Sequence, residues 1–332
     1  MKNVADPIDR ALLDDWQRGF PITARPFLRM ANVLNIAEDD LLARLQRMVA
    51  CGRIARVGAT CAPNTISAST LAAIAAPPER IEEVAALIQD EPGINHSYLR
   101  EDTWNLWFVA TGPDRAYVDA TLARLEQRSG LRVLDLRLVR PFNVDLGFRM
   151  NQPEAGKIPR THRATDLSVL REDDRDILQA LSVGLPLTSA PYAALGFDLG
   201  RSEDDILDRV AVLAEANIIS RLGVIVRHRA LGWSANAMVV WNVPADQVAI
   251  AGPRLALQPG VTLCYERTPV EGVWPYRLYS MIHAQSRLEA LKHLSNAAAI
   301  PELAGVQYKA LFSLRCFKQT GAMIAARPER AA

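Results

Sequence analysis

The sequence of 332 residues has few of the residues that build disulfide-linked or metal-bound folds. It contains four cysteines, and no two of them have the Cys-x-x-Cys spacing of a redox or zinc motif. These cysteines are Cys51, Cys61, Cys264 and Cys316. The pattern predicts reduced thiols and argues against a disulfide framework and a zinc site. We therefore expect no metal site belonging to the protein itself.

A charge excess of one sign and long apolar runs are also missing. The net charge of +1 gives no overall field that would attract nucleic acid or an acidic membrane surface. No apolar run approaches the roughly 20 residues of a membrane span, and the first residues lack the apolar stretch of a signal peptide. We therefore expect a cytoplasmic protein without a membrane partner. The chain is too long for one typical domain, so two or more are expected.

What the sequence does contain is a long internal repeat. Residues of several different types recur at a constant spacing, which is 165 residues in the first part of each copy and 167 residues in the second part. The matched segments are 19–21 with 184–186, 38–40 with 203–205, Tyr98 with Tyr265, and Arg100 with Arg267. This period is far longer than that of a solenoid, so it indicates domain duplication.

Each copy begins with a helical part. In the first copy, Leu12, Leu13 and Trp16 have the spacing of a buried helix face, and a third helix begins at the acidic turn 38–40. The segment 51–58 is typical of the small β-wing that closes many helix-turn-helix units. The same order returns in the second copy.

The second part of each copy predicts strand, helix, strand, strand, helix, strand, which is the ferredoxin-like order. The elements are expected at 70–75, 79–89, 94–100, 104–111, 114–128 and 133–140, and again at 237–243, 246–257, 261–267, 276–284, 286–296 and 306–317. We expect the two ferredoxin-like domains to pack as a pseudo-two-fold pair, because each sheet has an apolar face to bury.

The predicted fold class is α+β, a tandem duplication of a winged helix-turn-helix and a ferredoxin-like (βαββαβ) domain. The first copy comprises a helix-turn-helix domain at 1–62 and a ferredoxin-like domain at 63–148. A proline-containing linker without apolar periodicity follows at 149–168. The second copy comprises a helix-turn-helix domain at 169–229 and a ferredoxin-like domain at 230–322.

A predicted hairpin in the first copy carries the most informative side chains. If 94–100 is extended, His96, Tyr98 and Arg100 share one face. An imidazole, a phenol and a guanidinium are costly to bury without partners, but they suit the binding of a flat anionic ligand. The second copy keeps the tyrosine and the arginine but has Leu263 in place of the histidine. The hairpin register stays open, since Arg100 could face Trp104 or Asn105.

A helix-turn-helix joined to a ferredoxin-like domain resembles the Lrp/AsnC family, whose members are mostly amino-acid-responsive transcription regulators. The segment 96–101 with 104–108 is similar to the D-type subunit of siroheme decarboxylase, and 263–267 with 274–283 is similar to the L-type subunit. The resemblance covers nearly the whole chain except the linker and the C-terminal tail. One departure is Asp102, where related D-type motifs often carry a second histidine.

The resemblance implies an enzyme, a carbon-carbon lyase that removes two acetate side chains of siroheme as CO2. The product would be didecarboxysiroheme on the route to haem d1, and a related route leads to haem b. No cofactor beyond the iron tetrapyrrole substrate is implied. The implied partners are siroheme and, as further subunits, a second copy or related decarboxylase chains, without nucleic acid.

The site residues follow from the resemblance and from the chemistry that each side chain supports. Tyrosine and histidine suit proton delivery, and a neutral imidazole can also ligate iron. Arginine meets a carboxylate with a planar fork. The catalytic candidates are His96, Tyr98, Tyr265 and His283. The substrate-binding candidates are Arg100, Trp104, Asn105, Trp107, Arg267, Tyr276 and Arg277.

Structural roles are the alternative for each of these residues. His96 could be an interface histidine and His283 could cap a strand, while the aromatic residues could belong to the core. Arg100 and Arg267 could pair with neighbouring carboxylates, which contributes little. Since Leu263 can neither ligate iron nor move a proton, the sequence predicts one working site per chain, with His96 essential.

Two other functions compete with the enzyme. The helix-turn-helix units suggest a DNA-binding regulator of the Lrp/AsnC type. However, the presumed recognition helices open with 38–40 and 203–205, which are acidic, and carboxylates there repel phosphate. A haem-binding sensor or carrier without chemistry is the third hypothesis.

Overall fold

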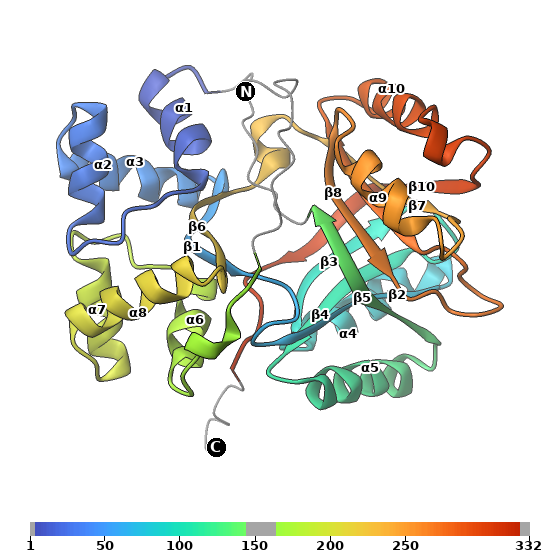
Figure 1. Ribbon diagram of the computed structural model, residues 1–332, viewed down its shortest axis with the longest axis horizontal. Helices are drawn as coiled ribbons and strands as arrows, with labels where there is room; N and C mark the ends of the chain where they lie inside the picture. The colour runs from blue at the N-terminus through green and yellow to red at the C-terminus, as the bar shows by residue number, and fades with distance from the viewer. Residues whose placement is uncertain (1–3, 144–163, 326–332) are drawn as a thin grey trace.

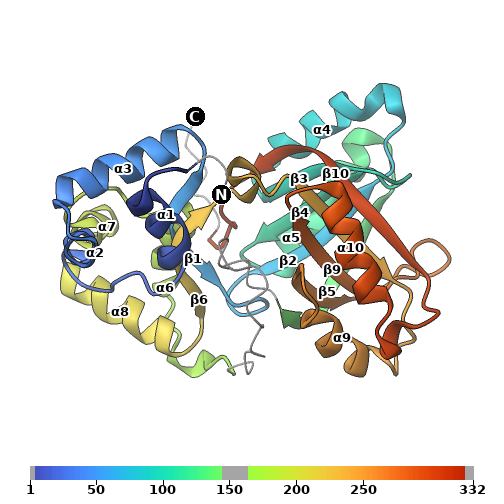
Figure 2. The same cartoon turned by 90° about the horizontal axis from the view of Figure 1, so that it is seen from above.

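The computed structural model describes residues 4–143 and 164–325. Most of the predicted linker, from residue 149 to 163, lies outside the described residues. Figures 1 and 2 show two lobes, one helical and one built around a sheet with helices on its outside. The helix-turn-helix parts of both copies form the first lobe, and the ferredoxin-like parts of both copies form the second.

The helical lobe has one apolar core to which both copies contribute. Asp6 caps the first helix by accepting hydrogen bonds from the Ile8 and Asp9 amides, and Pro7 provides a preset first turn. The elements of the first copy are α1 (Pro7–Asp14), η1 (Asp15–Gln17), α2 (Pro26–Leu34) and α3 (Glu38–Ala50). Those of the second copy are η3 (Leu167–Val169), α6 (Asp174–Val183), α7 (Pro191–Leu199) and α8 (Glu203–Glu215). In the described ranges no helix has both the length and the apolar character needed to cross a bilayer.

The segment predicted as a wing is a strand that pairs with its counterpart in the other copy. β1 (Ile54–Cys61) and β6 (Ile219–Val226) form an antiparallel two-stranded sheet in which Gly58 lies opposite Gly223. A Cβ atom on Gly58 would lie 2.4 Å from the Leu181 carbonyl oxygen, so this close approach requires glycine.

The second lobe is a closed eight-stranded barrel in the order β10-β3-β4-β2-β5-β8-β9-β7. The first copy provides β2 (Ala68–Ile74), η2 (Pro78–Arg80), α4 (Ile81–Asp90), β3 (Ile94–Arg100), β4 (Leu106–Gly112), α5 (Arg115–Ser129) and β5 (Val133–Asn143). The second copy provides η4 (His228–Leu231), β7 (Ala235–Trp241), α9 (Val248–Ala256), β8 (Val261–Arg267), β9 (Leu278–Ala284), α10 (Arg287–Ala298), η5 (Pro301–Leu303) and β10 (Tyr308–Gln319).

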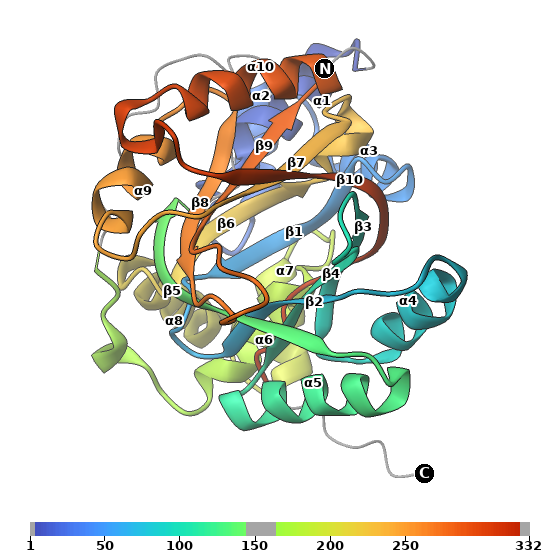
Figure 3. The same ribbon diagram turned by 90° about the vertical axis from the view of Figure 1, so that its right-hand side faces the viewer.

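Two long strands close the barrel. β5 pairs first with β2 of its own copy and then with β8 of the other copy, and β10 likewise pairs with β7 and then with β3. The predicted pairing of the two ferredoxin-like domains is therefore confirmed, and their sheets also join edge to edge, which leaves no open edge. Helices α4, α5, α9 and α10 lie on the outside (Figure 3), over two separate apolar clusters, while a third cluster fills part of the interior.

The structure settles the hairpin register that the sequence left open. The Arg100 amide donates to the Asn105 carbonyl oxygen at 2.8 Å, and Leu99 pairs with Leu106. The predicted strand starts at 104 and 276 were wrong, because β4 begins at Leu106 and β9 at Leu278. Asn105 instead holds the backbone of Ala76 from both sides, with its side-chain oxygen 3.0 Å from the amide nitrogen and its side-chain nitrogen 2.8 Å from the carbonyl oxygen.

A segment after β10 ties the two lobes together. The Met323 amide donates to the Thr111 hydroxyl at 2.9 Å, and the Ile324 amide donates to the Gln179 side chain of α6 at 2.7 Å. The Ser182 hydroxyl donates to the Ala322 carbonyl oxygen at 2.9 Å. These contacts fix the helical lobe against the end of the barrel.

Candidate active site

A cavity of about 630 Å³, here called the large cavity, lies inside the barrel. Its volume falls in the usual range of ligand pockets. Much of its wall consists of residues at matching positions of the two copies. The pairs are Leu71 with Met238, His96 with Leu263, Tyr98 with Tyr265, and Val109 with Met281. The large cavity therefore straddles the boundary between the copies.

Among the described residues, the other lining residues are not matched by a lining residue at the corresponding position of the other copy. Arg100 and Cys316 come from the adjoining strands β3 and β10, and Asn236 and His283 come from β7 and β9. The segment Arg227–Ala230, between β6 and β7, contributes next to Gly52 of the helical lobe. The large cavity is thus asymmetric although the fold around it is duplicated.

Three side chains of β3, those of His96, Tyr98 and Arg100, lie in a row on the cavity face, as the alternation of an extended strand predicts. The rings of His96 and Tyr98 are nearly parallel, with centroids 6.5 Å apart. The guanidinium carbon of Arg100 lies 5.2 Å from the centroid of the Tyr98 ring. The expectation that these three residues share one face is confirmed.

The lining is basic. It includes Arg100, Arg227 and Arg229, and it includes no aspartate or glutamate among the described residues. Burial lowers the pKa of Arg100 to about 10, and the nearby tyrosines oppose that shift. Behind the lining, burial and the neighbouring charge of Arg221 lower the pKa of Arg56 to about 10 as well. A polycarboxylate ligand would supply the negative charge that this environment lacks.

The three histidines of the lining are held in the neutral form. Burial lowers the pKa of His96 to about 4, and the charge of Arg56 lowers it further. Burial and then Arg221 lower the pKa of His228 to about 4. Burial, followed by His228 and Arg100, lowers the pKa of His283 to about 3. The ligand-free cavity therefore has no protonated imidazole at neutral pH.

The structure brings six of the predicted site residues to the lining. They are His96, Tyr98, Arg100, Trp107, Tyr265 and His283. Trp107 also packs against Trp274 with centroids 5.3 Å apart, so it joins the cavity to the interior apolar cluster.

The other five predicted residues lie away from the lining. Trp104 and Tyr276 pack against the interior cluster, and Asn105 holds Ala76. Arg267 lies 4.6 Å from the Tyr265 ring centroid and donates to the Leu136 carbonyl oxygen at 2.7 Å. The Arg277 amide donates to the Trp241 carbonyl oxygen at the start of β9. Tyr265 thus separates Arg267 from the cavity.

Sequence reasoning missed the residues between β6 and β7. His228 lies with its ring centroid 5.7 Å from that of His283, and Arg227 and Arg229 flank it. A signal was available in the repeat, because the basic triplet 227–229 corresponds to the uncharged 62–64 in the first copy. Asn236 was also missed, and no motif marks it.

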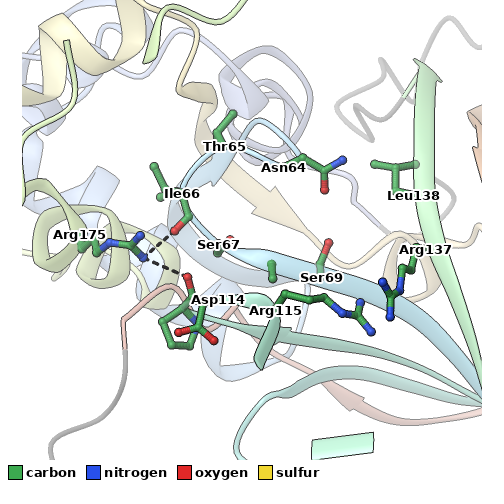
Figure 4. Close-up of a pocket in the computed structure, with 12 residues that line it drawn as sticks. Asn64, Thr65, Ile66, Ser67, Ser69, Asp114, Arg115, Arg137, Leu138 and Arg175 are labelled. Atoms are coloured by element: carbon green, nitrogen blue, oxygen red, sulfur yellow. Dashed lines mark hydrogen bonds between the residues drawn. The ribbon is translucent and has the colours of Figure 1, made fainter. Parts of the chain in front are cut away.

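A smaller cavity of about 390 Å³ borders the equivalent strands of the first copy, β2 and β5. Figure 4 shows its arginines and the loop 64–69. Arg175 donates to the carbonyl oxygens of Ile66 and Pro113 at 2.6 and 3.2 Å. Arg115 and Arg137 both donate to Asp135, at 2.6 and 2.8 Å. In this small cavity the cations already have partners.

Comparison with known families matches both parts of each copy. Residues 66–142 and 230–318 match the AsnC-like ligand binding domain. Residues 9–54 and 174–219 match the siroheme decarboxylase NirDL-like HTH domain. The matches occur in pairs, which agrees with the internal repeat.

Comparison with individual proteins covers nearly the whole chain. The siroheme decarboxylase NirDL subunit of Paracoccus pantotrophus is 54% identical over 96% of this chain and 98% of that protein. The NirD subunit of Stutzerimonas stutzeri is 45% identical over 45% of this chain and 97% of its own. A crystal structure of the siroheme decarboxylase NirDL with an iron-uroporphyrin III analogue has a TM-score of 0.68 at 26% identity, covering 96% of this chain and 94% of that one. The chain therefore belongs to the NirDL family of siroheme decarboxylases, as its paired hairpin motifs predicted.

Proposed function

We propose that this protein removes two ring acetate groups of siroheme as CO2 and yields didecarboxysiroheme, as a carbon-carbon lyase. One observation carries the proposal. The large cavity combines an apolar wall, a row of His96, Tyr98 and Arg100, and a lining to which the described residues contribute no carboxylate. That combination suits a flat macrocycle whose edge bears carboxylates. Haem d1 is the proposed end product of the pathway.

Arginine side chains hold the substrate carboxylates in this proposal. Arg100 is only 5% exposed, and no carboxylate of the described residues pairs with it. A buried guanidinium without a counter-ion is costly, and the cost falls when a ligand supplies the anion. Arg227 and Arg229 at the rim are exposed and add attraction for further carboxylates.

The reaction breaks the bond between the acetate methylene and its carboxylate. The carboxylate leaves as CO2, and its bonding electron pair stays on the methylene, where the conjugated ring delocalises it. A proton must then reach that carbon to form the methyl group. The balance is one proton consumed and one CO2 released per acetate, with no net oxidation. His96 is the proposed proton donor, and it is recharged from solvent.

Substrate binding itself supplies the condition for this proton transfer. In the ligand-free cavity His96 is neutral because burial and Arg56 lower its pKa to about 4. Carboxylates that enter the cavity offset the charge of Arg56 and raise the pKa of His96, since a nearby anion favours the imidazolium. His96 would therefore take up its proton together with the substrate.

The two tyrosines serve as hydrogen-bonding groups. Burial raises the pKa of Tyr98 to about 12, so its phenol stays protonated beside His96. Tyr265 occupies the matching position across the boundary between the copies. Both can donate to a carboxylate without adding a charge.

A cytoplasmic location is part of the proposal. The four cysteines are free thiols, as expected for a reducing compartment.

The acidic first turns of the presumed recognition helices α3 and α8 argue against DNA binding. They are partly occupied by ion pairs, such as Glu38 with Arg25 and Asp205 with Arg201. We expect no specific DNA complex in mobility-shift experiments at moderate salt.

The test is to mix the purified protein with siroheme under anaerobic conditions and to measure the mass of the product. We expect the loss of two molecules of CO2 per siroheme. Tight binding of siroheme that is recovered unchanged would overturn the enzyme and leave a carrier. A sequence-dependent DNA complex with no turnover would favour a regulator.

A further inference from the structure

A chain of hydrogen bonds crosses from Arg100 of the first copy into the second copy. Arg100 Nη1 donates to Asn236 Oδ1 at 3.2 Å. Asn236 Nδ2 lies 2.7 Å from His283 Nε2. His283 Nδ1 lies 2.7 Å from the Thr262 hydroxyl, which lies 3.2 Å from the Met281 carbonyl oxygen. The four residues whose side chains form this series of hydrogen bonds all lie on strands of the barrel.

The chemistry of the two ends fixes the direction of every bond in the chain. A guanidinium has only donors, so Asn236 must turn its oxygen to Arg100 and its NH2 group to His283. His283 Nε2 must then accept, and its ring proton must be on Nδ1. That proton is donated to Thr262, whose own hydroxyl proton is donated to the Met281 carbonyl oxygen.

Protonation of His283 would break this chain. An imidazolium carries a proton on both ring nitrogens, so its Nε2–H would face the NH2 group of Asn236. The groups that face His283 also oppose the charge, since His228 and Arg100 add to the effect of burial in lowering its pKa. His283 therefore acts as a hydrogen-bond acceptor with a fixed tautomer.

The other end of the chain leaves one edge of Arg100 available. Both hydrogen bonds from its side chain leave from Nη1, one to Asn236 and one to the Leu311 carbonyl oxygen at 3.1 Å. Its Nε is buried and has no hydrogen-bond partner among the described residues. The Nε–Nη2 edge of a guanidinium is a two-pronged fork that matches a carboxylate.

We infer that Asn236 and His283 are positioning residues for the siroheme reaction, which hold Arg100 so that its Nε–Nη2 edge receives a substrate carboxylate. Neither residue supplies the proton in this assignment. The inference rests on the proposed function for its substrate. The hydrogen-bond chain itself exists in the ligand-free protein and can be tested there.

Binding measurements with siroheme test the role of Asn236. We expect N236A to weaken siroheme binding by roughly 10- to 100-fold, because a hydrogen bond to a charged group is worth about 1.5–3 kcal/mol. Ser69, at the corresponding position of the first copy, lines the small cavity, so S69A is the matched control and should bind like the wild type. Wild-type affinity and turnover in N236A would overturn the inference, with thermal unfolding used to confirm that each variant is folded.

Two substitutions of His283 separate positioning from proton delivery. The side-chain oxygen of H283Q can accept from Asn236, so this variant should retain affinity and turnover within a few fold. H283L cannot accept, and it should weaken binding as N236A does. If both variants bound siroheme normally and both lost turnover, His283 would be the proton donor and the inference would be wrong.

A measurement without substrate keeps this test separate from the proposed function. In the ligand-free protein, ¹⁵N NMR of the histidine rings should show His283 with a proton on Nδ1 and no titration above pH 5. In N236A the ring should titrate at a higher pH, because the contact that disfavours the proton on Nε2 is gone. A proton on Nε2 in the wild type would overturn the inference even if siroheme is decarboxylated. Failure of the wild type to decarboxylate siroheme would remove the proposed function and leave this result standing.

Discussion

The large and small cavities differ in one respect that decides their use, namely whether the described lining holds a buried arginine without a carboxylate partner. Both border equivalent strands of a duplicated barrel. In the small cavity, Arg115 and Arg137 donate hydrogen bonds to Asp135. In the large cavity, Arg100 has no carboxylate partner among the described residues. Pairing makes the small cavity a structural surface, whereas the unpaired Arg100 leaves the large cavity ready for an anion.

The two copies also differ in the polar residues at matching strand positions. The first copy has Ser69 and Thr111 at the positions of Asn236 and His283, and the second copy has Leu263 at the position of His96. The Thr111 hydroxyl is used structurally, since it donates to the Gly93 carbonyl oxygen and accepts from the Met323 amide. A fused chain can change one copy without the other, which a symmetric dimer of identical chains cannot do.

The largest effect is expected for substitution of His96, the proposed proton donor, which the second copy lacks. H96A should lose turnover by roughly a hundred- to ten-thousand-fold, because that is the usual cost of losing a general acid. L263A, at the matching position of the second copy, is the control and should keep most of the activity. Turnover of siroheme followed by product mass measures both variants. Normal turnover in H96A would place the proton donor elsewhere.

The number of sites tests the same comparison directly. Optical titration of siroheme into the protein should saturate near one per chain, because, of the two cavities, it is the large one that holds a buried guanidinium without a carboxylate partner among the described residues. A stoichiometry near two would show that the small cavity also binds siroheme, which would contradict the asymmetry.

The loss of siroheme affinity in arginine variants should be larger the closer the arginine lies to the lining of the large cavity. R100A should weaken siroheme binding by roughly 10- to 100-fold, because a charge-assisted pair is lost. R267A should have a smaller effect, since Tyr265 lies between Arg267 and the cavity. R277A should have the least effect of the three. Equal losses of affinity in all three would mean that the substrate reaches beyond the described lining.

The three histidines that line the large cavity predict a pH dependence of stability in the ligand-free protein. The pKa values of His96, His228 and His283 are about 4, 4 and 3, below the ordinary value near 6.5. The unfolded chain therefore binds more protons, so the free energy of unfolding falls as the pH falls from about 6.5 toward 4. Thermal unfolding should show a lower midpoint at pH 5 than at pH 7, and H283L should reduce that difference. A midpoint independent of pH would mean that these rings are solvated.

Much of the fold was predictable because hydrophobic periodicity and the internal repeat can both be read directly along the sequence. The predicted β3 and β8 match the structure, and most other elements differ by a few residues. The closure of the barrel was not predictable, because the extension of β5 and β10 onto the other copy depends on partners far away in sequence. The shared β1–β6 sheet was missed for the same reason.

The candidate site was predictable only where one strand carries it. His96, Tyr98 and Arg100 are spaced by two residues, so their shared face follows from the strand alone. Asn236 and His283 join them through hydrogen bonds between different strands, and no sequence spacing encodes such a contact. Arg267 was expected at the site together with Arg100, but only Arg100 lies on the lining of the large cavity, because Tyr265 lies between Arg267 and that cavity.

The smallest expected effect is at the small cavity. The Arg137 side chain is 54% exposed, and exposed ion pairs such as its contact with Asp135 contribute only about 0–1 kcal/mol. R137A should therefore leave siroheme affinity unchanged within about twofold and change the free energy of unfolding by less than about 0.5 kcal/mol. R100A is the matched comparison, because it removes the same side chain at an unpaired and buried position. If R137A weakened siroheme binding as much as R100A, pairing would not be what separates the two cavities, and the substrate would have to contact both.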